Sequence, residues 1–412
     1  MREAMKTFRD GQWGWKSTSP FSQAVAIGDQ VFISGQQALS PDGEIIAPGD
    51  IAAQTRCVFE NMKAVLKQAG LELADLVRLN TYYVFDGADE DATAYWEEMT
   101  RVRLEYFPNP GPAATAVRIK GMPYQGQLIQ IEGIALKGAS RANRKRIMPK
   151  GSWDWSIPVP LSQGWEVDGR IYVGGQISAD RKGGAVHVGD LAAQTRAIYG
   201  FIGNVLKDGG ASFADVAHIK ICVKYDSAEP DGTSFLNRIL DVTKEYVGAD
   251  GPVVTCFGVD LLYPGLDLEI DAMAFKGKHD RISIGSAPMK THGGQFADGV
   301  SVLGEVWIGG QVALDDAGAV MSPGDIKEQA RTVFQRVKEA LQASGASLDD
   351  VVKLNLFFAS DGADVREEFH TAMAVWAEMS PRSAPAMTAV RVYELSKPGL
   401  LVQADCVAVK ST

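Results

Sequence analysis

The sequence has few metal-binding or redox-active residues, with four cysteines and five histidines among 412 residues. No two cysteines form a Cys-x-x-Cys pair, so neither a disulfide framework nor a thiolate zinc site is indicated. The histidines are equally scattered, and ligands at helical or hairpin spacing are missing. We therefore expect no metal site and no cofactor. The cysteines are Cys57, Cys222, Cys256 and Cys406.

Long apolar runs and a basic surface are also missing. No run approaches the roughly 18 residues of a membrane span, and the first residues lack the apolar core of a signal peptide. The formal net charge is −10, which argues against a nucleic-acid partner because basic side chains are needed to neutralise phosphates. We expect a cytoplasmic protein with no membrane and no nucleic-acid partner. The one basic stretch, residues 141–150, is interpreted as a solvated connector.

The chain instead contains a long internal repeat. A block beginning Gly-Asp and ending in Arg occurs at residues 49–56, 189–196 and 324–331, so successive copies are offset by 140 and 135 residues. This period is far longer than the 20–50 residues of solenoid repeats, which predicts that each copy is a complete small domain. We predict domains at residues 1–140, 150–278 and 280–412, with a linker at 141–149.

Each copy shows the same order of elements. In the first copy, a Gly28-Asp29 turn between β-branched segments predicts a hairpin. A helix is expected from the N-cap Asp50 to Gly70, with an apolar stripe that must be buried. A strand, a second helix and two closing strands complete the copy. This order predicts an α/β (α+β) unit whose sheet has one apolar face, packed against the helices, and one polar face.

Three linked copies allow the polar faces of the sheets to cover one another. We therefore predict an intrachain pseudo-trimer with a central β-barrel-like core and the helices outside. Covalent linkage replaces the entropy cost of assembling three chains. The expected partner is a small-molecule substrate, and the expected oligomer is a monomer or a dimer of such pseudo-trimers.

Five ordered segments of the first copy, residues 19–25, 32–36, 49–56, 111–117 and 129–135, resemble the successive signatures of the Rid/YjgF family. The resemblance extends to all three copies and is strongest in the first. It implies three chorismate-mutase-like domains, fused into one chain, with clefts between them. It also implies a hydrolase or deaminase that opens the C–N bond of an enamine or imine. A non-catalytic small-molecule-binding or regulatory protein is the alternative.

The sequence departs from this family at two positions. The family's deaminases carry an arginine that binds the substrate carboxylate through a bidentate ion pair. At this position the three copies have Ala114, Val254 and Met387. A family tyrosine is likewise replaced by Phe21 and Leu161, and in the third copy by Phe296. The resemblance therefore implies a substrate that is less acidic and more aromatic than the family's enamine acids.

Three features of the family persist, and they supply most of the candidate site residues. The acidic residue of the last strand, which the resemblance implies handles the proton or water, matches Glu132, Asp271 and Asp405. A carboxylate can act as general base toward water, and imine hydrolysis needs little more. The alternative role is an interlocking charge on the inner sheet. The substrate-binding candidates that the family implies are Phe21, Gln36, Gln176, Gln311, Thr115, Thr255 and Thr388.

Strand parity adds further candidates. Arg118 and Arg391 share a face with Ala114 and Met387 respectively, and either substitute for the missing cation or form ordinary strand salt bridges. In the second copy, Glu269 lies two residues before Asp271 on one face, so each raises the pKa of the other and an acid/base pair is favoured.

Two further features of the sequence each leave two roles open. Cys256 is either a nucleophile that contacts the substrate or a small buried thiol. The tryptophans at residues 13, 15, 153 and 155 either line an aromatic pocket or pack in the core.

Overall fold

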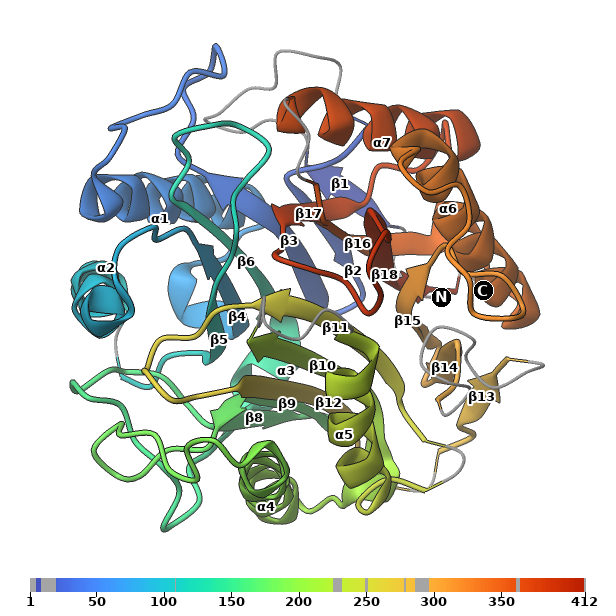
Figure 1. The fold of residues 1–412 in the computed structure, drawn as a ribbon. Coiled ribbons are helices and arrows are strands. Elements are labelled where there is room, and N and C mark those ends of the chain that lie inside the picture. The colour runs from blue at the N-terminus through green and yellow to red at the C-terminus, as the bar shows by residue number, and fades with distance from the viewer. Residues whose placement is uncertain are drawn as a thin grey trace.

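The computed structural model describes residues 5–8, 20–107, 109–224, 232–248, 251–277, 279–285, 296–360 and 364–410. Trp13 and Trp15 lie outside these residues. The described chain forms three similar units, each a six-stranded sheet with two long helices (Figure 1). The prediction of three tandem α+β domains is therefore confirmed. No helix in the described ranges is long and apolar enough to cross a membrane.

The first unit has the strand order β1-β2-β3-β6-β4-β5. Its pairs are antiparallel except for β4 and β5, which run parallel. This exception follows from the helix that connects them, because a crossover returns the chain in the same direction. The strands are β1 (Lys6–Phe8), β2 (Ala24–Ile27), β3 (Gln30–Gln37), β4 (Leu76–Tyr83), β5 (Ala113–Arg118) and β6 (Ile129–Leu136), and the long helices are α1 (Ile51–Gln68) and α2 (Ala92–Tyr106).

The second and third units repeat this topology, with parallel pairs β10–β11 and β16–β17. The second unit consists of β7 (Lys145–Ile147), β8 (Gly164–Val167), β9 (Arg170–Ile177), α4 (Leu191–Gly209), β10 (Val216–Lys224), α5 (Gly232–Lys244), β11 (Val253–Val259) and β12 (Leu268–Phe275). The third consists of β13 (Ile282–Ile284), β14 (Gly299–Val302), β15 (Glu305–Val312), α6 (Ile326–Ala343), β16 (Val351–Phe358), α7 (Val365–Met379), β17 (Ala386–Arg391) and β18 (Val402–Val409).

The segment between the first two units is built into the fold. The short helix α3 (Gly138–Asn143) is followed by β7, which is the edge strand of the second sheet. The predicted connector at 141–149 therefore contains a strand. Two of its basic residues contact other parts of the chain: Arg141 pairs with Glu72 and Asp75, and Arg144 lies over the ring of Trp165.

The first helix of each unit begins at an aspartate, as predicted for Asp50. The Asp50 side chain accepts a hydrogen bond from the backbone N–H of Ala53 at 2.8 Å, and Asp190 and Asp325 form the same cap. These caps satisfy backbone donors that a helix start leaves unpaired. The stripe that follows is buried against the sheet, with Val58, Phe59 and Met62 fully covered in the first unit.

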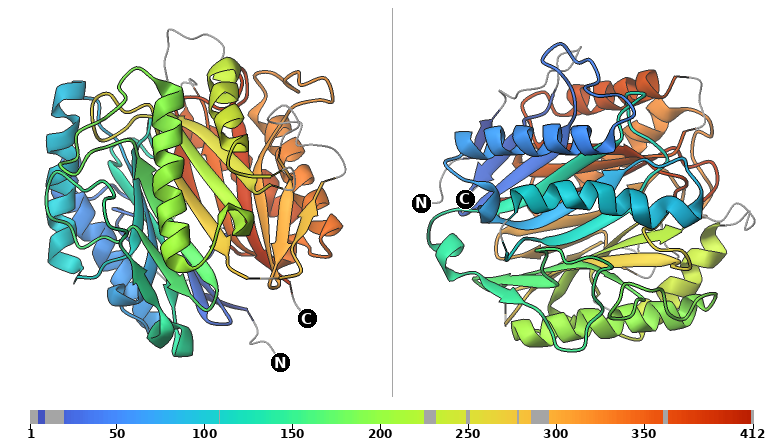
Figure 2. Two further views of the ribbon diagram at one scale, coloured as in Figure 1. Left: turned by 90° about the horizontal axis from the view of Figure 1, so that it is seen from below. Right: turned by 90° about the vertical axis from the view of Figure 1, so that its left-hand side faces the viewer.

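The three units contact one another in a cyclic order. Strand β5 of unit 1 packs against β9 of unit 2, β11 of unit 2 against β15 of unit 3, and β17 of unit 3 against β3 of unit 1. We call these contacts the 1/2, 2/3 and 3/1 boundaries. Figures 1 and 2 show the resulting arrangement, in which the strands lie inside and the long helices cover the outside. The inner faces of the three sheets thus meet around a pseudo-threefold axis. The prediction of a polar inner face is only partly right, because a buried apolar cluster from all three units, including Phe32, Trp165 and Trp307, also lies between the sheets.

Candidate functional site

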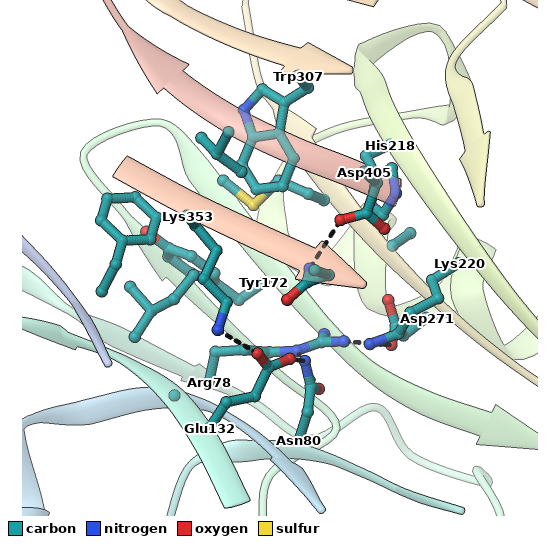
Figure 3. Close-up of a pocket in the computed structure, with 17 residues that line it drawn as sticks. Arg78, Asn80, Glu132, Tyr172, His218, Lys220, Asp271, Trp307, Lys353 and Asp405 are labelled. Atoms are coloured by element: carbon teal, nitrogen blue, oxygen red, sulfur yellow. Dashed lines mark hydrogen bonds and ion pairs between the residues drawn. The ribbon is translucent and has the colours of Figure 1, made fainter. Parts of the chain in front are cut away.

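The carboxylates Glu132, Asp271 and Asp405 lie around this axis, where the three boundaries meet. They come from corresponding positions of β6, β12 and β18 and are each at least 96% buried. They line a cavity of about 70 Å³ to which all three sheets contribute (Figure 3). Aromatic side chains of Phe32 and Trp307 form part of its wall.

Two of these three carboxylates form ion pairs across a boundary. Glu132 of unit 1 pairs with Lys353 of unit 3. Asp271 of unit 2 pairs with Arg78 of unit 1 and also with Lys220 of its own unit, at 3.1 Å. Glu132 and Asp271 therefore each lie beside one or two cations in a region from which water is largely excluded.

These cations determine the protonation state of both groups. Burial raises the pKa of Glu132, but the charges of Lys353 and Lys220 outweigh it and lower this pKa to about 2. Burial likewise opposes ionisation of Asp271, whose pKa is nevertheless lowered by Arg78 and Lys220. A carboxylate held ionised in this way is a weak base, so the two groups are better suited to joining the units than to transferring protons.

Asp405 differs from the other two carboxylates because the residue that faces it, at the repeat position of Arg78 and Lys353, is His218. Its carboxylate accepts hydrogen bonds from Asn355 Nδ2 at 2.7 Å and from the hydroxyl of Thr255 at 2.8 Å. Burial dominates, and it raises the pKa of Asp405 to about 6. His218 is partly buried, and loss of hydration lowers its pKa to about 3, so this imidazole is neutral at physiological pH.

Asp405 should make stability depend on pH. Its folded pKa of about 6 lies above its ordinary value of 3.8, so the folded state binds this proton more tightly than the unfolded state. Stability should then fall by roughly 3 kcal/mol as pH rises from about 4 to about 6. The Asp405→Asn variant should lack this component when unfolding is measured at each pH. An identical pH dependence in the two proteins would contradict the assignment.

The predicted substrate-binding polar groups are largely engaged within the protein. The three threonines donate hydrogen bonds to the axis carboxylates: Thr115 to Asp271, Thr255 to Asp405 and Thr388 to Glu132. The three glutamines also donate hydrogen bonds within the protein: Gln36 to Gln23 Oε1, Gln176 to Gln163 Oε1, and Gln311 to the carbonyl of Gly309. Phe21, Leu161 and Phe296 are buried.

The two strand arginines also have partners. Arg118 pairs with Asp260 of unit 2 and with Asp89 at 2.7 Å, and it lies over the ring of Phe85. Arg391 donates to the carbonyl of Ser360 at 2.8 Å. Each guanidinium is thus held by protein groups near a boundary.

Cys256 and the second tryptophan pair also lie in the interior. Burial raises the pKa of the Cys256 thiol, which keeps it protonated. Trp153 is buried and packs edge-on against Trp155, with ring centroids 4.9 Å apart. Its Nε1 donates to Gln176 Oε1 at 3.1 Å, beside the 1/2 boundary.

Glu269 is the acidic residue that lies at a boundary without a cation partner among the described residues. It comes from β12 and is 97% buried, with Oε1 lying 3.4 Å from the backbone N of Ala116 in unit 1. Its Oε2 has no hydrogen-bond partner in the part of the chain that the structure describes. Burial, aided by the charge of Asp271, raises the pKa of Glu269 to about 8. This side chain is therefore mostly protonated at pH 7.

The other two boundaries have an amide in place of this carboxylate. Gln130 of unit 1 and Gln403 of unit 3 occupy the corresponding positions on β6 and β18. All three side chains fold over a glycine of the adjacent strand, where a Cβ would overlap them: Gly35, Gly175 and Gly310. The backbone geometry is shared, so the 1/2 boundary is distinguished by its ionisable group.

Sequence reasoning missed the axis cations. Arg78, Lys220 and Lys353 are buried charged residues on strands that otherwise read as apolar. The internal repeat could have indicated these cations, because Arg78, His218 and Lys353 occupy the same position in the three copies. No group of three histidine, cysteine, aspartate or glutamate side chains within the described ranges is suited to hold a metal ion.

The chain is similar to known proteins in each of its units. The family model described as Endoribonuclease L-PSP matches residues 14–137, 156–276 and 287–410. A RutC family protein of Pyrococcus abyssi (strain GE5 / Orsay) is 38% identical over 122 residues, which cover 30% of this chain and 90% of that protein. The 2-iminobutanoate/2-iminopropanoate deaminase of Homo sapiens is 29% identical over 119 residues, which cover 29% of this chain and 81% of that protein.

One solved structure resembles most of the chain at once. A chorismatase structure covers 82% of this chain and 93% of its own, with a TM-score of 0.50 and 14% sequence identity. At this identity the likeness concerns the fold alone.

Proposed function

We propose that this chain, which belongs to the Endoribonuclease L-PSP family, known also as Rid/YjgF, hydrolyses the C–N bond of a small imine or enamine. The reaction takes place at the 1/2 boundary, and Glu269 is its general acid and base. The observation that carries this proposal is a buried, uncompensated carboxyl group with a pKa of about 8 at one boundary out of three. The relatives named as iminopropanoate deaminases support the reaction class.

The proposed chemistry needs one group that both gives and accepts a proton near neutral pH. The protonated Glu269 carboxyl first gives its proton to the imine nitrogen. Water then adds to the carbon, and the Glu269 carboxylate accepts a proton from that water. The carboxyl next protonates the nitrogen of the resulting carbinolamine, the C–N bond breaks, and the carboxylate takes up the hydroxyl proton. A ketone and ammonia leave, and Glu269 is again protonated.

The substrate class follows from the residues beside Glu269. Ala114 stands where a bidentate arginine is expected, and its backbone packs closely against Gly174 of unit 2. Arg118, on the same strand, is engaged by Asp260. The boundary therefore offers no free guanidinium among the described residues, while Trp153 supplies aromatic surface nearby. These features favour a substrate without a carboxylate and with an apolar or aromatic substituent.

An ammonia-release assay tests the proposal. The whole chain is incubated with a panel of enzymatically generated imines that includes aromatic members and carboxylate-bearing ones. We expect turnover that favours the aromatic, uncharged imines over the carboxylate-bearing ones. Tight binding of panel members without ammonia release would instead identify a non-catalytic binding protein.

Gly175 provides a steric test with a matched control. A Cβ at Gly175 would overlap Glu269 Oε1, whereas a Cβ at Gly35 would overlap the Gln130 amide at the 3/1 boundary. Gly175→Ala should lower kcat/KM by about tenfold or more, because displacement of a catalytic group by about 1 Å is costly. Gly35→Ala should perturb the fold equally and leave kcat/KM unchanged. Equal losses in both variants would show that the effect is not specific to Glu269.

A further inference from the structure

The axis cavity contains two positions that a cationic side chain fills and a third at which the repeat has a histidine. At the 3/1 boundary, Lys353 Nζ pairs with Glu132, donates to Thr388 Oγ1 at 2.7 Å and donates to the carbonyl of Ile33 at 3.3 Å. At the 1/2 boundary, Arg78 contacts the corresponding acceptors, which are Asp271, Thr115 Oγ1 and the carbonyl of Val173. The repeat thus defines a cation site made of a carboxylate, a hydroxyl and a backbone carbonyl.

At the 2/3 boundary the corresponding repeat positions hold Asp405, Thr255 and Ile308, and the facing residue is His218. Its Nε2 lies 3.0 Å from Thr255 Oγ1. Since the Thr255 hydroxyl donates to Asp405, His218 Nε2 must carry a proton and donate to Thr255, which leaves Nδ1 as an acceptor. The imidazole is neutral, and no lysine or arginine nitrogen within the described ranges forms an ion pair with Asp405. The third carboxylate is therefore buried without a counter-charge.

A second acceptor at the same place is also unsatisfied. Asn355 donates its Nδ2 to Asp405, while its buried Oδ1 has no hydrogen-bond partner among the residues described here. In unit 1 the corresponding Asn80 Oδ1 accepts a hydrogen bond from Arg78 Nε of its own strand at 3.0 Å, whereas Lys353, which holds that place on the strand of Asn355, is paired with Glu132. The cavity of about 70 Å³ is lined by Asp405, Asn355 and His218, with the Trp307 ring in its wall (Figure 3). An unpaired acceptor and open space thus lie beside the one axis carboxylate that has no ion-pair partner among the described residues.

We propose that this cavity binds an ammonium ion beside Asp405, the axis carboxylate that faces an imidazole where the other two face the Lys353 ammonium and the Arg78 guanidinium. An ammonium ion supplies a counter-charge, and its N–H donors match the acceptors Asp405 and Asn355 Oδ1, which both line the cavity. The cavity of about 70 Å³ has room for such an ion, since about 10–15 Å³ of such space is enough for one water molecule. The face of an aromatic ring such as Trp307 adds attraction for a cation.

The other charged groups in the cavity do not fill this role. Lys220 is committed to Asp271, and Lys353 to Glu132. This proposal does not rest on the hydrolase activity, because it concerns binding at the axis and not chemistry at Glu269.

Thermal unfolding of the whole chain in different salts tests the site. We expect the Tm at pH 7.5 to rise in a saturable way with ammonium chloride, relative to sodium chloride at equal ionic strength, because a ligand that binds only the folded state stabilises it. Methylammonium chloride should act similarly. Tetramethylammonium chloride, which has no N–H donor, should have no effect.

Two variants make the test specific to the site. His218→Lys places an ammonium group of the chain itself at this position, as Lys353 does in unit 3. It should have a higher Tm than the wild type in sodium chloride and should not respond to ammonium. Asp405→Asn should also lose the response. If His218→Lys does not fold, His218→Arg takes its place, and the Asp405→Asn comparison tests the site independently.

Three results would overturn the proposal. An equal Tm of the wild type in ammonium and sodium salts would show that the ion does not bind. A response of equal size to potassium chloride would show a site for any monovalent cation of this radius. A response that persists in His218→Lys and Asp405→Asn would place ammonium binding elsewhere. None of these results bears on Glu269, which is tested by turnover.

Discussion

Replacing Glu269 with glutamine should lower kcat/KM for imine hydrolysis by at least about 100-fold, because a general acid and base contributes roughly 10²–10⁴ to rate. The amide retains the shape and polarity of the side chain but cannot transfer a proton. The other two boundaries already have glutamine at this position, in Gln130 and Gln403. Glu269→Gln therefore makes all three boundaries alike, and the measurement is steady-state ammonia release.

The pH dependence gives this prediction a second readout. With a pKa of about 8, Glu269 is in its acid form below that pH. The wild-type kcat/KM should therefore decline as pH rises through about 8, and the residual activity of Glu269→Gln should not show this decline. Gln403→Ala is the matched control and should retain wild-type kcat/KM and its pH profile. Retention of more than half of the wild-type activity in Glu269→Gln would contradict the proposed role.

Stability measurements separate this effect from unfolding. A carboxyl group whose pKa is raised in the folded state opposes folding once pH exceeds its ordinary value, 4.5 for Glu269. Glu269→Gln should thus be as stable as the wild type or more so, with the gain largest above pH 8. A lower Tm together with lost activity would point to a structural role.

The second large effect concerns the axis ion pair of Lys353 and Glu132. Lys353→Met should lower the free energy of unfolding by about 3–5 kcal/mol at pH 7, because it leaves Glu132 buried and ionised without its partner. The double variant Glu132→Gln/Lys353→Met removes both charges and should recover most of this loss. Chemical unfolding followed by tryptophan fluorescence measures the three proteins side by side.

A surface lysine supplies the control for this pair. Lys63 forms an ion pair with Glu60 at 3.0 Å, with both side chains about half exposed. Lys63→Met should change stability by less than about 1 kcal/mol, because exposed pairs are screened by water and salt. A Lys353→Met variant as stable as Lys63→Met, or a double variant no better than Lys353→Met alone, would mean that the pair does not join units 1 and 3.

Much of the fold was predictable because its signals are local and occur three times. The caps at Asp50, Asp190 and Asp325 and the stripes that follow them depend on spacing within one helix. The edge strands β1, β7 and β13 were not predicted, since each spans three residues and carries no alternating pattern of its own. Tertiary pairing with β2, β8 and β14 creates these strands.

The candidate site was less accessible to sequence reasoning. Strand parity correctly places Gln130 and Glu132 on one face of β6 and Glu269 and Asp271 on one face of β12. It does not separate a side chain that reaches the axis from one that reaches a boundary, because that depends on how neighbouring sheets pack. The contacts of Glu132 with Lys353 and of Glu269 with Ala116 join residues more than 150 positions apart.

A crystal structure of the whole chain with an unreactive amide analogue of its best imine substrate would show directly which boundary carries the chemistry. We expect one analogue per chain, at the 1/2 boundary, with its nitrogen or oxygen within hydrogen-bonding distance of Glu269. An analogue bound in the axis cavity, or one at each of the three boundaries with equal occupancy, would contradict the claim that a single boundary carries the chemistry.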